Sequence, residues 1–448
     1  MRALGIDFGT SHTVAAVRDD TGATRSLLFD GSPLLPSAVF LDADGRLLAG
    51  GDAVRSARLD PARFEPHPKR RIDDRVVLLG DREVAVVDLV AGVLRRVAEE
   101  ARRFAGAAFD VWLSHPAGWS QPRRQVLVDA CAAAGLPVPR LVPEPVAAAA
   151  YFTAVLRAAM PPGSALAVYD LGGGTFDAAV VRRVGIGFQV LSEGGLSDVG
   201  GVDFDQALVE HLGREYANAR TGLWQGLLSP ADAGGRRQRA LLYDDVRAGK
   251  EALSRSAAVD VHLPALDVAA HVTRDELEAI IRPELARTVD CLAHTIAAAH
   301  LPAEDLVGVF LVGGSSRIPL AARMIHQRLG VAPTTLEQPE TAVAEGVLCL
   351  DAPTPPAPAP VAPMSPAAPY PHSGPPYPQS VPPSASPYTV PPSAPFSGAP
   401  TAGAMPLSVQ LPAPVRPWYA EPGLWGVVVL SVLVVVAAAV LIWLLATG

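Results

Sequence analysis

The sequence contains one short pattern twice, and this repeat constrains the fold more than any other feature. Residues 3–17 place an apolar run, an aspartate (Asp7), a Gly-Thr turn and a second apolar run in that order. Residues 165–181 repeat the order around Asp170. Because apolar runs that turn back through glycine are typical of β-hairpins, the repeat predicts two lobes of similar topology whose turns face each other.

Both turns carry the residue types that hold a phosphate chain. Glycines let backbone N–H groups approach phosphate oxygens without a Cβ in the way, and hydroxyl groups add donors. A carboxylate at the end of each first strand suits the water shell of Mg²⁺. One such hairpin alone is usually only a tight turn, but the matched pair favours a triphosphate and its metal between the lobes. The predicted residues are Gly9, Thr10 and Ser11, then Gly172, Gly173, Gly174 and Thr175, with Asp7 and Asp170 for the metal.

Other local signals predict helices between the strands. Ser120 is expected to cap a helix that stops at Gly135, and Thr273 with Glu276 forms a capping-box pattern that opens a helical run over residues 274–300. Pro283 is expected to kink or split that run. Strands that alternate with helices predict an α/β fold.

The C-terminal part has a different composition. Residues 352–423 hold 24 of the 44 prolines, and only Arg416 and Glu421 are charged. Such a stretch cannot bury a core, so we expect a disordered linker. The composition leaves open a spacer, which is favoured, or a docking strip for aromatic-lined grooves.

Residues 424–446 form an apolar segment of 23 residues without a charge. A helix of that length covers about 35 Å, enough for a bilayer core. The N-terminus shows no apolar signal-peptide region, because Asp7 interrupts the first apolar residues. These features predict a single-pass C-terminal tail anchor with residues 1–351 in the cytoplasm.

Composition also argues against several classes of protein. Cys131, Cys291 and Cys349 are too far apart to indicate a disulfide framework or a zinc cluster. The formal net charge of −8 lies within residues 1–351, since Arg416 and Glu421 cancel. An acidic domain is a poor binder of nucleic acid, so no nucleic-acid partner is expected.

Three motifs resemble the ATPase domain of the 70-kDa heat-shock chaperone family. They are Gly-Ile-Asp-Phe-Gly-Thr at residues 5–10, Asp-Leu-Gly-Gly-Gly-Thr-Phe-Asp at 170–177, and Val-Gly-Gly-Ser-Ser-Arg-Ile-Pro at 312–319. The resemblance covers about residues 1–350. It implies an actin-like (ribonuclease H-like) α/β fold, with lobes at about 1–162 and 163–351 around a cleft that holds ATP or ADP with Mg²⁺.

The same resemblance implies roles for individual residues. Lys69 would reach the γ-phosphate and the attacking water, Glu144 would orient that water or help hold the metal, and Asp170 and Thr175 would complete the catalytic set. Gly200 and Gly201 would lie near the phosphates. Further nucleotide contacts would come from Lys250, Ser254, Gly313, Gly314, Ser315, Arg317 and Glu340. Arg317 could also stack on a flat base.

Some positions depart from the family pattern. Arg247 stands where a glutamate normally contacts the ribose, Val202 replaces a glutamate after the glycine pair, and His12 occupies a small polar position. The phosphate end therefore matches the family, whereas the nucleoside end differs. Downstream, residues 348–351 run directly into proline, so we expect the family's peptide-binding domain to be absent.

These observations together predict a membrane-anchored ATPase domain that slowly hydrolyses Mg-ATP as a conformational switch. Its expected partner is a protein, such as a nucleotide-exchange or membrane-complex protein. One alternative is a scaffold that binds nucleotide without hydrolysis. A small-molecule kinase of actin-like fold is disfavoured, because Glu144 between two prolines follows the chaperone pattern.

Overall fold

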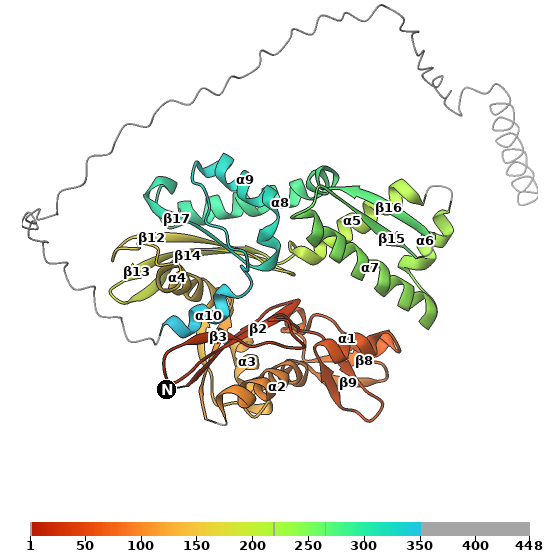
Figure 1. The fold of residues 1–448 in the computed structure, drawn as a ribbon, viewed down its shortest axis with the longest axis horizontal. Coiled ribbons are helices and arrows are strands. Elements are labelled where there is room, and N and C mark those ends of the chain that lie inside the picture. Colours follow the sequence, from red (N-terminus) through yellow and green to blue (C-terminus); the bar gives the residue numbers. More distant parts are fainter. Residues whose placement is uncertain (1, 107, 218–219, 265, 351–448) are drawn as a thin grey trace, which may run out of the picture. The chain divides into compact units, whose positions relative to one another are not determined.

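The structure is a computed structural model that describes residues 2–350, apart from residues 107, 218–219 and 265 (Figure 1). The predicted linker at 352–423 and the predicted membrane segment at 424–446 lie outside the described residues. Within the described ranges, no helix has both the length and the hydropathy that crossing a membrane requires.

The first lobe is built on a mixed sheet with the strand order β11-β10-β1-β2-β3, in which β4 also pairs with β2. β1 and β2 form the predicted antiparallel hairpin, and β10 runs parallel to β1. The strands are β1 (Ala3–Phe8), β2 (His12–Arg18), β3 (Thr24–Ser26), β4 (Leu35–Pro36), β10 (Asp110–His115) and β11 (Arg140–Pro143).

The second lobe repeats this arrangement in the sheet β14-β13-β12-β17. β12 and β13 form an antiparallel hairpin, and β17 runs parallel to β12 as β10 does to β1. Asp7 and Asp170 each occupy the last position but one of their strand. The predicted repeat is thereby confirmed. The strands are β12 (Ala165–Leu171), β13 (Phe176–Val184), β14 (Gly187–Leu196) and β17 (Leu306–Val312).

Alternating side chains of each central strand pack on opposite helical layers. Leu4, Ile6 and Phe8 share one buried cluster with α2 (Val86–Ala105) and α3 (Gln121–Ala133). In the second lobe, Tyr169 and Leu171 pack with α5 (Gly201–Tyr216), α8 (Arg274–Ala298) and α9 (Pro319–Leu329). This period of two is expected of strands that are covered on both faces.

Two helices lie against the remaining sheet faces and join the lobes (Figure 1). α4 (Glu144–Ala154) contributes Ala147 to a cluster on the first sheet and Phe152 to a cluster on the second. α10 (Ala342–Cys349) packs on α4 and on β1. Gly5 permits this approach, since a Cβ there would lie 2.7 Å from Val347. The predicted lobe boundary at 162–163 falls between α4 and β12.

Smaller elements extend each lobe. The first lobe adds a sheet in the order β6-β5-β7, the hairpin β8–β9, and α1, while the second adds the hairpin β15–β16 with α6 and α7. Their bounds are β5 (Val39–Leu41), β6 (Leu47–Ala49), β7 (Phe64–Glu65), β8 (Val76–Leu79), β9 (Arg82–Ala85), α1 (Gly51–Ala57), α6 (Thr221–Leu228), α7 (Ala233–Leu253), β15 (Ala258–Leu263) and β16 (Val268–Thr273).

The predicted helices form, with two differences in detail. Ser120 occupies the N-cap position of α3, but its side chain makes no capping hydrogen bond. Gly135 takes a positive φ of 69° just after that helix ends, and Thr273 forms the predicted capping box with Glu276. Of the kink or split predicted at Pro283, the split is wrong, because α8 continues through this residue. Proline removes one backbone hydrogen bond, which destabilises the helix. Burial of an apolar face on both sides of Pro283 stabilises the helix by more than this loss. That face consists of Leu277, Ile281, Leu285, Val289, Leu292 and Ile296.

Candidate functional site

A cavity of about 760 Å³ lies between the two lobes, and we call it the main cavity. The β1–β2 and β12–β13 turns form one end, and α7 with the segment Gly314–Arg317 forms the other. Eighteen of the predicted site residues line it: Asp7, Gly9, Thr10, Ser11, Lys69, Glu144, Asp170, Gly172, Gly173, Thr175, Gly201, Lys250, Ser254, Gly313, Gly314, Ser315, Arg317 and Glu340.

The two remaining predicted residues, Gly174 and Gly200, lie against each other outside that lining. A Cβ on Gly200 would come within 2.7 Å of the Gly174 backbone. The Gly174 carbonyl accepts a hydrogen bond of 2.7 Å from the Arg70 guanidinium. These glycines therefore support the second turn from outside the lining.

The turns of the two hairpins meet, as the repeat predicts. A Cβ on Gly173 would lie 2.9 Å from Ser11 Cβ, and one on Gly174 would lie 2.8 Å from Arg70 Nε. Only glycine allows the second turn to approach the first lobe this closely. Arg70 also reaches Asp203 of the second lobe at 3.1 Å, which adds a charged contact between the lobes.

The hairpin end of the main cavity holds a buried ion pair. Lys69 Nζ lies 3.0 Å from Glu144 Oε1, and the two side chains are 13% and 7% exposed. Lys69 comes from the short helix Pro68–Arg71, and Glu144 is the first residue of α4. Ser114 Oγ donates a 2.6 Å hydrogen bond to Asp7, and Thr175 Oγ1 donates one of 3.1 Å to Asp177.

Carboxyl groups crowd around this one ammonium. Burial raises the pKa of Glu144 to about 7, against the attraction of Lys69, and the charges of Asp7 and Asp177 raise it further. The pKa of Asp170 is raised well above its usual range by burial and then by the charge of Glu144. Burial lowers the pKa of Lys69, but Glu144 and Asp7 outweigh that effect and raise it overall. The lysine is therefore charged, and the carboxyl groups resist ionisation.

This donor set fits a hydrated divalent cation. Mg²⁺ binds carboxylate oxygens and usually keeps several of its own waters. Asp7 and Asp170 line the main cavity from facing hairpins. Burial raises the pKa of both carboxyl groups, and the positive charge of Lys69 does not fully offset that effect. Within residues 2–350 as described, no three acidic, histidine or cysteine side chains converge as a direct metal cage. The fit is thus to a cation held partly through water.

The opposite end of the main cavity contains ion pairs of its own. Lys250 Nζ lies 2.7 Å from Asp205 Oδ1 and donates a 2.6 Å hydrogen bond to the Gly201 carbonyl. Arg247 Nε lies 3.6 Å from the other oxygen of Asp205. Asp205 is buried, so these two cations of α7 stabilise its charge. Arg247, which departs from the family pattern, is therefore paired with Asp205 of the same chain.

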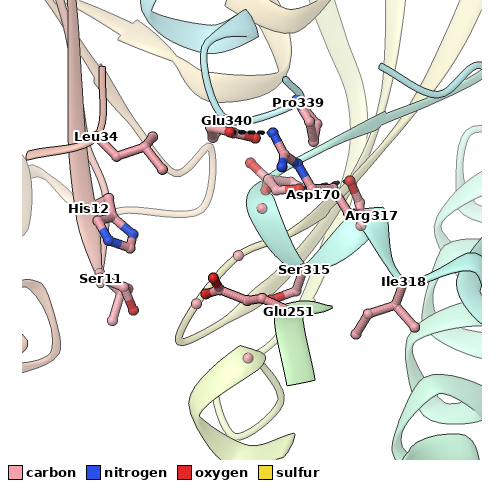
Figure 2. Close-up of a pocket in the computed structure, with 18 of the residues that line it drawn as sticks. Ser11, His12, Leu34, Asp170, Glu251, Ser315, Arg317, Ile318, Pro339 and Glu340 are labelled. Carbon is pink, nitrogen blue, oxygen red and sulfur yellow. Dashed lines mark hydrogen bonds and ion pairs between the residues drawn. The ribbon is translucent and has the colours of Figure 1, made fainter. Parts of the chain in front are cut away.

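Figure 2 shows the two walls between these ends. The side chains of His12 and Leu34 face the cavity from the first lobe, and Ser315 and Arg317 face it from the second. Arg317 Nη2 lies 2.6 Å from Glu340 Oε1, which fixes the guanidinium beside the space between the walls. A planar group between the walls would contact the Arg317 guanidinium on one side.

His12 stays neutral in this setting. Burial lowers its pKa to about 4, and the positive charges of Arg247 and His67 add to that effect. The site thus contains an imidazole next to the hairpin turn that does not add a positive charge at neutral pH.

Sequence reasoning missed three residues that the structure brings to the site. Asp177 pairs with Asp170 across the β12–β13 hairpin, Ser114 of β10 holds Asp7, and Asp205 anchors α7. Asp177 had a sequence signal, because it ends the motif that begins at Asp170. Ser114 and Asp205 had none that separated them from ordinary polar residues.

Comparison with known proteins agrees with this geometry. The sequence model of the family described as Hsp70 protein matches residues 61–350. The chain belongs to the Hsp70 family. Its mixed α/β fold with two related hairpins is consistent with the actin-like ATPase domain that the resemblance implies.

Individual chaperone proteins also match a large part of the chain. A chaperone protein HscA homolog of Variovorax paradoxus is 34% identical over 373 residues, which covers 77% of this chain and 57% of that protein. A chaperone protein HscA homolog of Burkholderia pseudomallei is 35% identical over 374 residues, with the same coverage. The chain thus spans less than two thirds of the length of these relatives.

Proposed function

We propose that this chain binds Mg-ATP in the main cavity and hydrolyses it slowly, as a conformational switch for a protein partner. The observation that carries the proposal is the buried Lys69–Glu144 pair at 3.0 Å, located among the carboxyl groups of two facing hairpins. Membership of the Hsp70 family and the HscA names of its relatives support it.

Two side chains of the pair have separate roles in this reaction. Water attacks the γ-phosphorus, the bond to the bridging oxygen breaks, and ADP leaves with the bonding electrons. Lys69 offsets the negative charge on the transferred phosphoryl group, and Glu144 orients the attacking water and accepts its proton. Asp7 and Asp170 would hold the magnesium ion, which shields phosphate charge when bound.

Slow turnover follows from the division of these groups between lobes. Lys69, Glu144 and Asp7 belong to elements of the first lobe, whereas Asp170 and Thr175 belong to the second. Their relative positions depend on how closely the lobes approach, so lobe closure gates the chemistry. A partner that favours one lobe arrangement would sense whether ATP or ADP is bound.

The tether is a further part of the proposal. The predicted linker at 352–423 and anchor at 424–446 would hold the ATPase domain at the cytoplasmic face of a membrane. Membrane flotation of the full chain, beside a variant that ends at residue 423, tests this directly. Recovery of both with soluble protein would contradict the anchor.

A single-turnover assay tests the catalytic proposal. Labelled ATP is mixed with excess full chain in Mg²⁺ or in EDTA, beside the Asp170→Asn variant. We expect ADP to form with Mg²⁺, and to form neither in EDTA nor with the variant. Equal ADP formation in the variant would show that the chemistry does not use this site.

A second candidate function is a scaffold that binds nucleotide without hydrolysis. The pairing of Arg247 and Lys250 with Asp205 favours the scaffold, because cations that already have an acidic partner contribute less to the binding of a nucleotide. Tight ATP binding without ADP formation in the same assay would support the scaffold. Transfer of phosphate to a small acceptor would instead support a kinase.

A further inference from the structure

A second cavity, of about 510 Å³, adjoins the main cavity, and we call it the side cavity. Both lobes contribute to it, with Trp119 and Arg123 on one side and Glu193 and Ser197 on the other. Six residues line both cavities: Thr10, Lys69, Glu144, Asp170, Thr175 and Asp177. The cavities therefore meet at the hairpin end, where the proposed function places the γ-phosphate.

Cations of increasing exposure line the side cavity. Lys69 stands at the junction and is 13% exposed, Arg70 is 33% exposed, and Arg123 is 40% exposed. They belong to the short helix Pro68–Arg71 and to α3. Such a series gives an anion successive partners between the buried pair and solvent.

Acidic groups prevent this series from becoming a strong anion trap. Asp73 accepts two hydrogen bonds from Arg123, at 2.7 and 2.6 Å, and Arg70 is paired with Asp203. Glu193 adds a further exposed carboxylate to the wall. Each of these cations would attract an anion in the side cavity, but the neighbouring carboxylates would keep its binding weak. Weak binding allows an anion to pass through the cavity.

We propose that inorganic phosphate leaves through the side cavity while ADP still occupies the main cavity. This inference rests on the proposed hydrolysis. After cleavage, ADP lies between the new phosphate ion and the nucleoside end of the main cavity. The six shared side chains lie where the two cavities meet, so the phosphate ion can also leave through the side cavity. The Lys69–Glu144 pair lies at the inner end of that path.

Gly118 allows the route to be narrowed without touching the catalytic groups. It is exposed and lines the side cavity, and an added Cβ would lie 3.5 Å from Glu193 Oε1, an ordinary contact. The Gly118→Phe variant would thus place a ring between the lobes. Gly222→Phe on α6 is the matched control, because an added Cβ there meets nothing within 4 Å.

The experiment follows cleavage and phosphate release separately in the full chain. Quenched single-turnover samples measure cleavage of labelled ATP, and a fluorescent phosphate sensor measures release. We expect Gly118→Phe to slow release about tenfold, or about 1.4 kcal/mol of added barrier, while cleavage stays within about twofold. Gly222→Phe should change neither. Ser197→Phe, from the opposite lobe, should repeat the effect.

Unchanged phosphate release in both Gly118→Phe and Ser197→Phe, when cleavage is normal, would overturn the route. If the chain does not cleave ATP, the proposed function fails, and labelled inorganic phosphate is then mixed with the ADP-bound chain. Slower uptake by Gly118→Phe would support the route on its own, whereas equal uptake, or no uptake by the unaltered chain, would overturn it.

Discussion

The two ends of the main cavity balance charge in different ways. At the hairpin end, the carboxyl groups of Asp7, Glu144, Asp170 and Asp177 all interact with the single ammonium of Lys69. At the nucleoside end, Asp205 has Lys250 and Arg247 as partners. Glu340 likewise has Arg317. At the first end several carboxyl groups share one ammonium, whereas at the second each of these carboxylates has its own cationic partner.

This difference bears on what a substitution does at each end. An end with excess negative charge depends on each residue that offsets it or shares a bound metal, so replacements there alter function. An end whose charges pair internally can exchange one pair for another. Of the departures from the family pattern, Arg247 lies at the self-paired end, whereas His12 and Val202 lie beside the hairpin turns. His12 begins β2, and the Val202 N–H donates a 2.8 Å hydrogen bond to the Gly173 carbonyl.

A large effect on hydrolysis is expected from removing the ammonium of Lys69 from the hairpin end. Lys69→Ala should lower the single-turnover hydrolysis rate by about 10²–10³, the usual effect of losing one group that stabilises transition-state charge. Arg71→Ala is the matched control, because Arg71 lies in the same short helix but pairs with Glu65 at 2.9 Å. A similar rate loss in both variants would point to a disturbed helix instead.

A smaller effect is expected at the nucleoside end. Arg247→Ala should weaken ATP binding about fivefold, because a half-exposed cation near a polyanion contributes about 1 kcal/mol. Hydrolysis at saturating ATP should not change. Isothermal titration and single-turnover assays measure the two quantities, with Arg239→Ala as a control on the outer part of α7. A loss of hydrolysis rate as large as that of Lys69→Ala would contradict the assignment of different roles to the two ends.

The smallest effect concerns stability. The folded chain raises the pKa of Glu144 to about 7 from the ordinary 4.5, so between these values it retains a proton that the unfolded chain has released. The free energy of unfolding should therefore fall as pH rises through this window. Mg²⁺ offsets the resulting repulsion, so it should raise Tm by about 2 °C more at pH 8 than at pH 5.

Differential scanning calorimetry of the nucleotide-free chain, with and without Mg²⁺, measures this difference. In Asp170→Asn the pH dependence of the magnesium effect should shrink. A larger magnesium effect at pH 5 than at pH 8 would contradict the charge assignment.

The sequence predicted the features that depend on short stretches of chain. Each hairpin is encoded by an apolar run, an aspartate and glycines in succession, and the structure confirms both. The capping box at Thr273 is equally local. From these, together with the family resemblance, the lobes and most of the site lining could be predicted.

Features that depend on distant contacts could not be predicted. Asp205 of α5 meets Arg247 and Lys250 only because α5 and α7 pack together. The side cavity needs Gly118 and Glu193 from different lobes to lie close in space. At Pro283, the local rule favoured a break, but the buried face of α8 outweighed it.

The central claim is that the hairpin end performs chemistry on a nucleotide that both ends bind. Glu144→Gln tests it most directly, because the amide keeps the size of the side chain but cannot accept a proton at neutral pH. The account predicts unchanged ATP affinity and a single-turnover hydrolysis rate lower by about 10²–10⁴. An unchanged rate would contradict the account, because the buried pair would then have no part in the reaction.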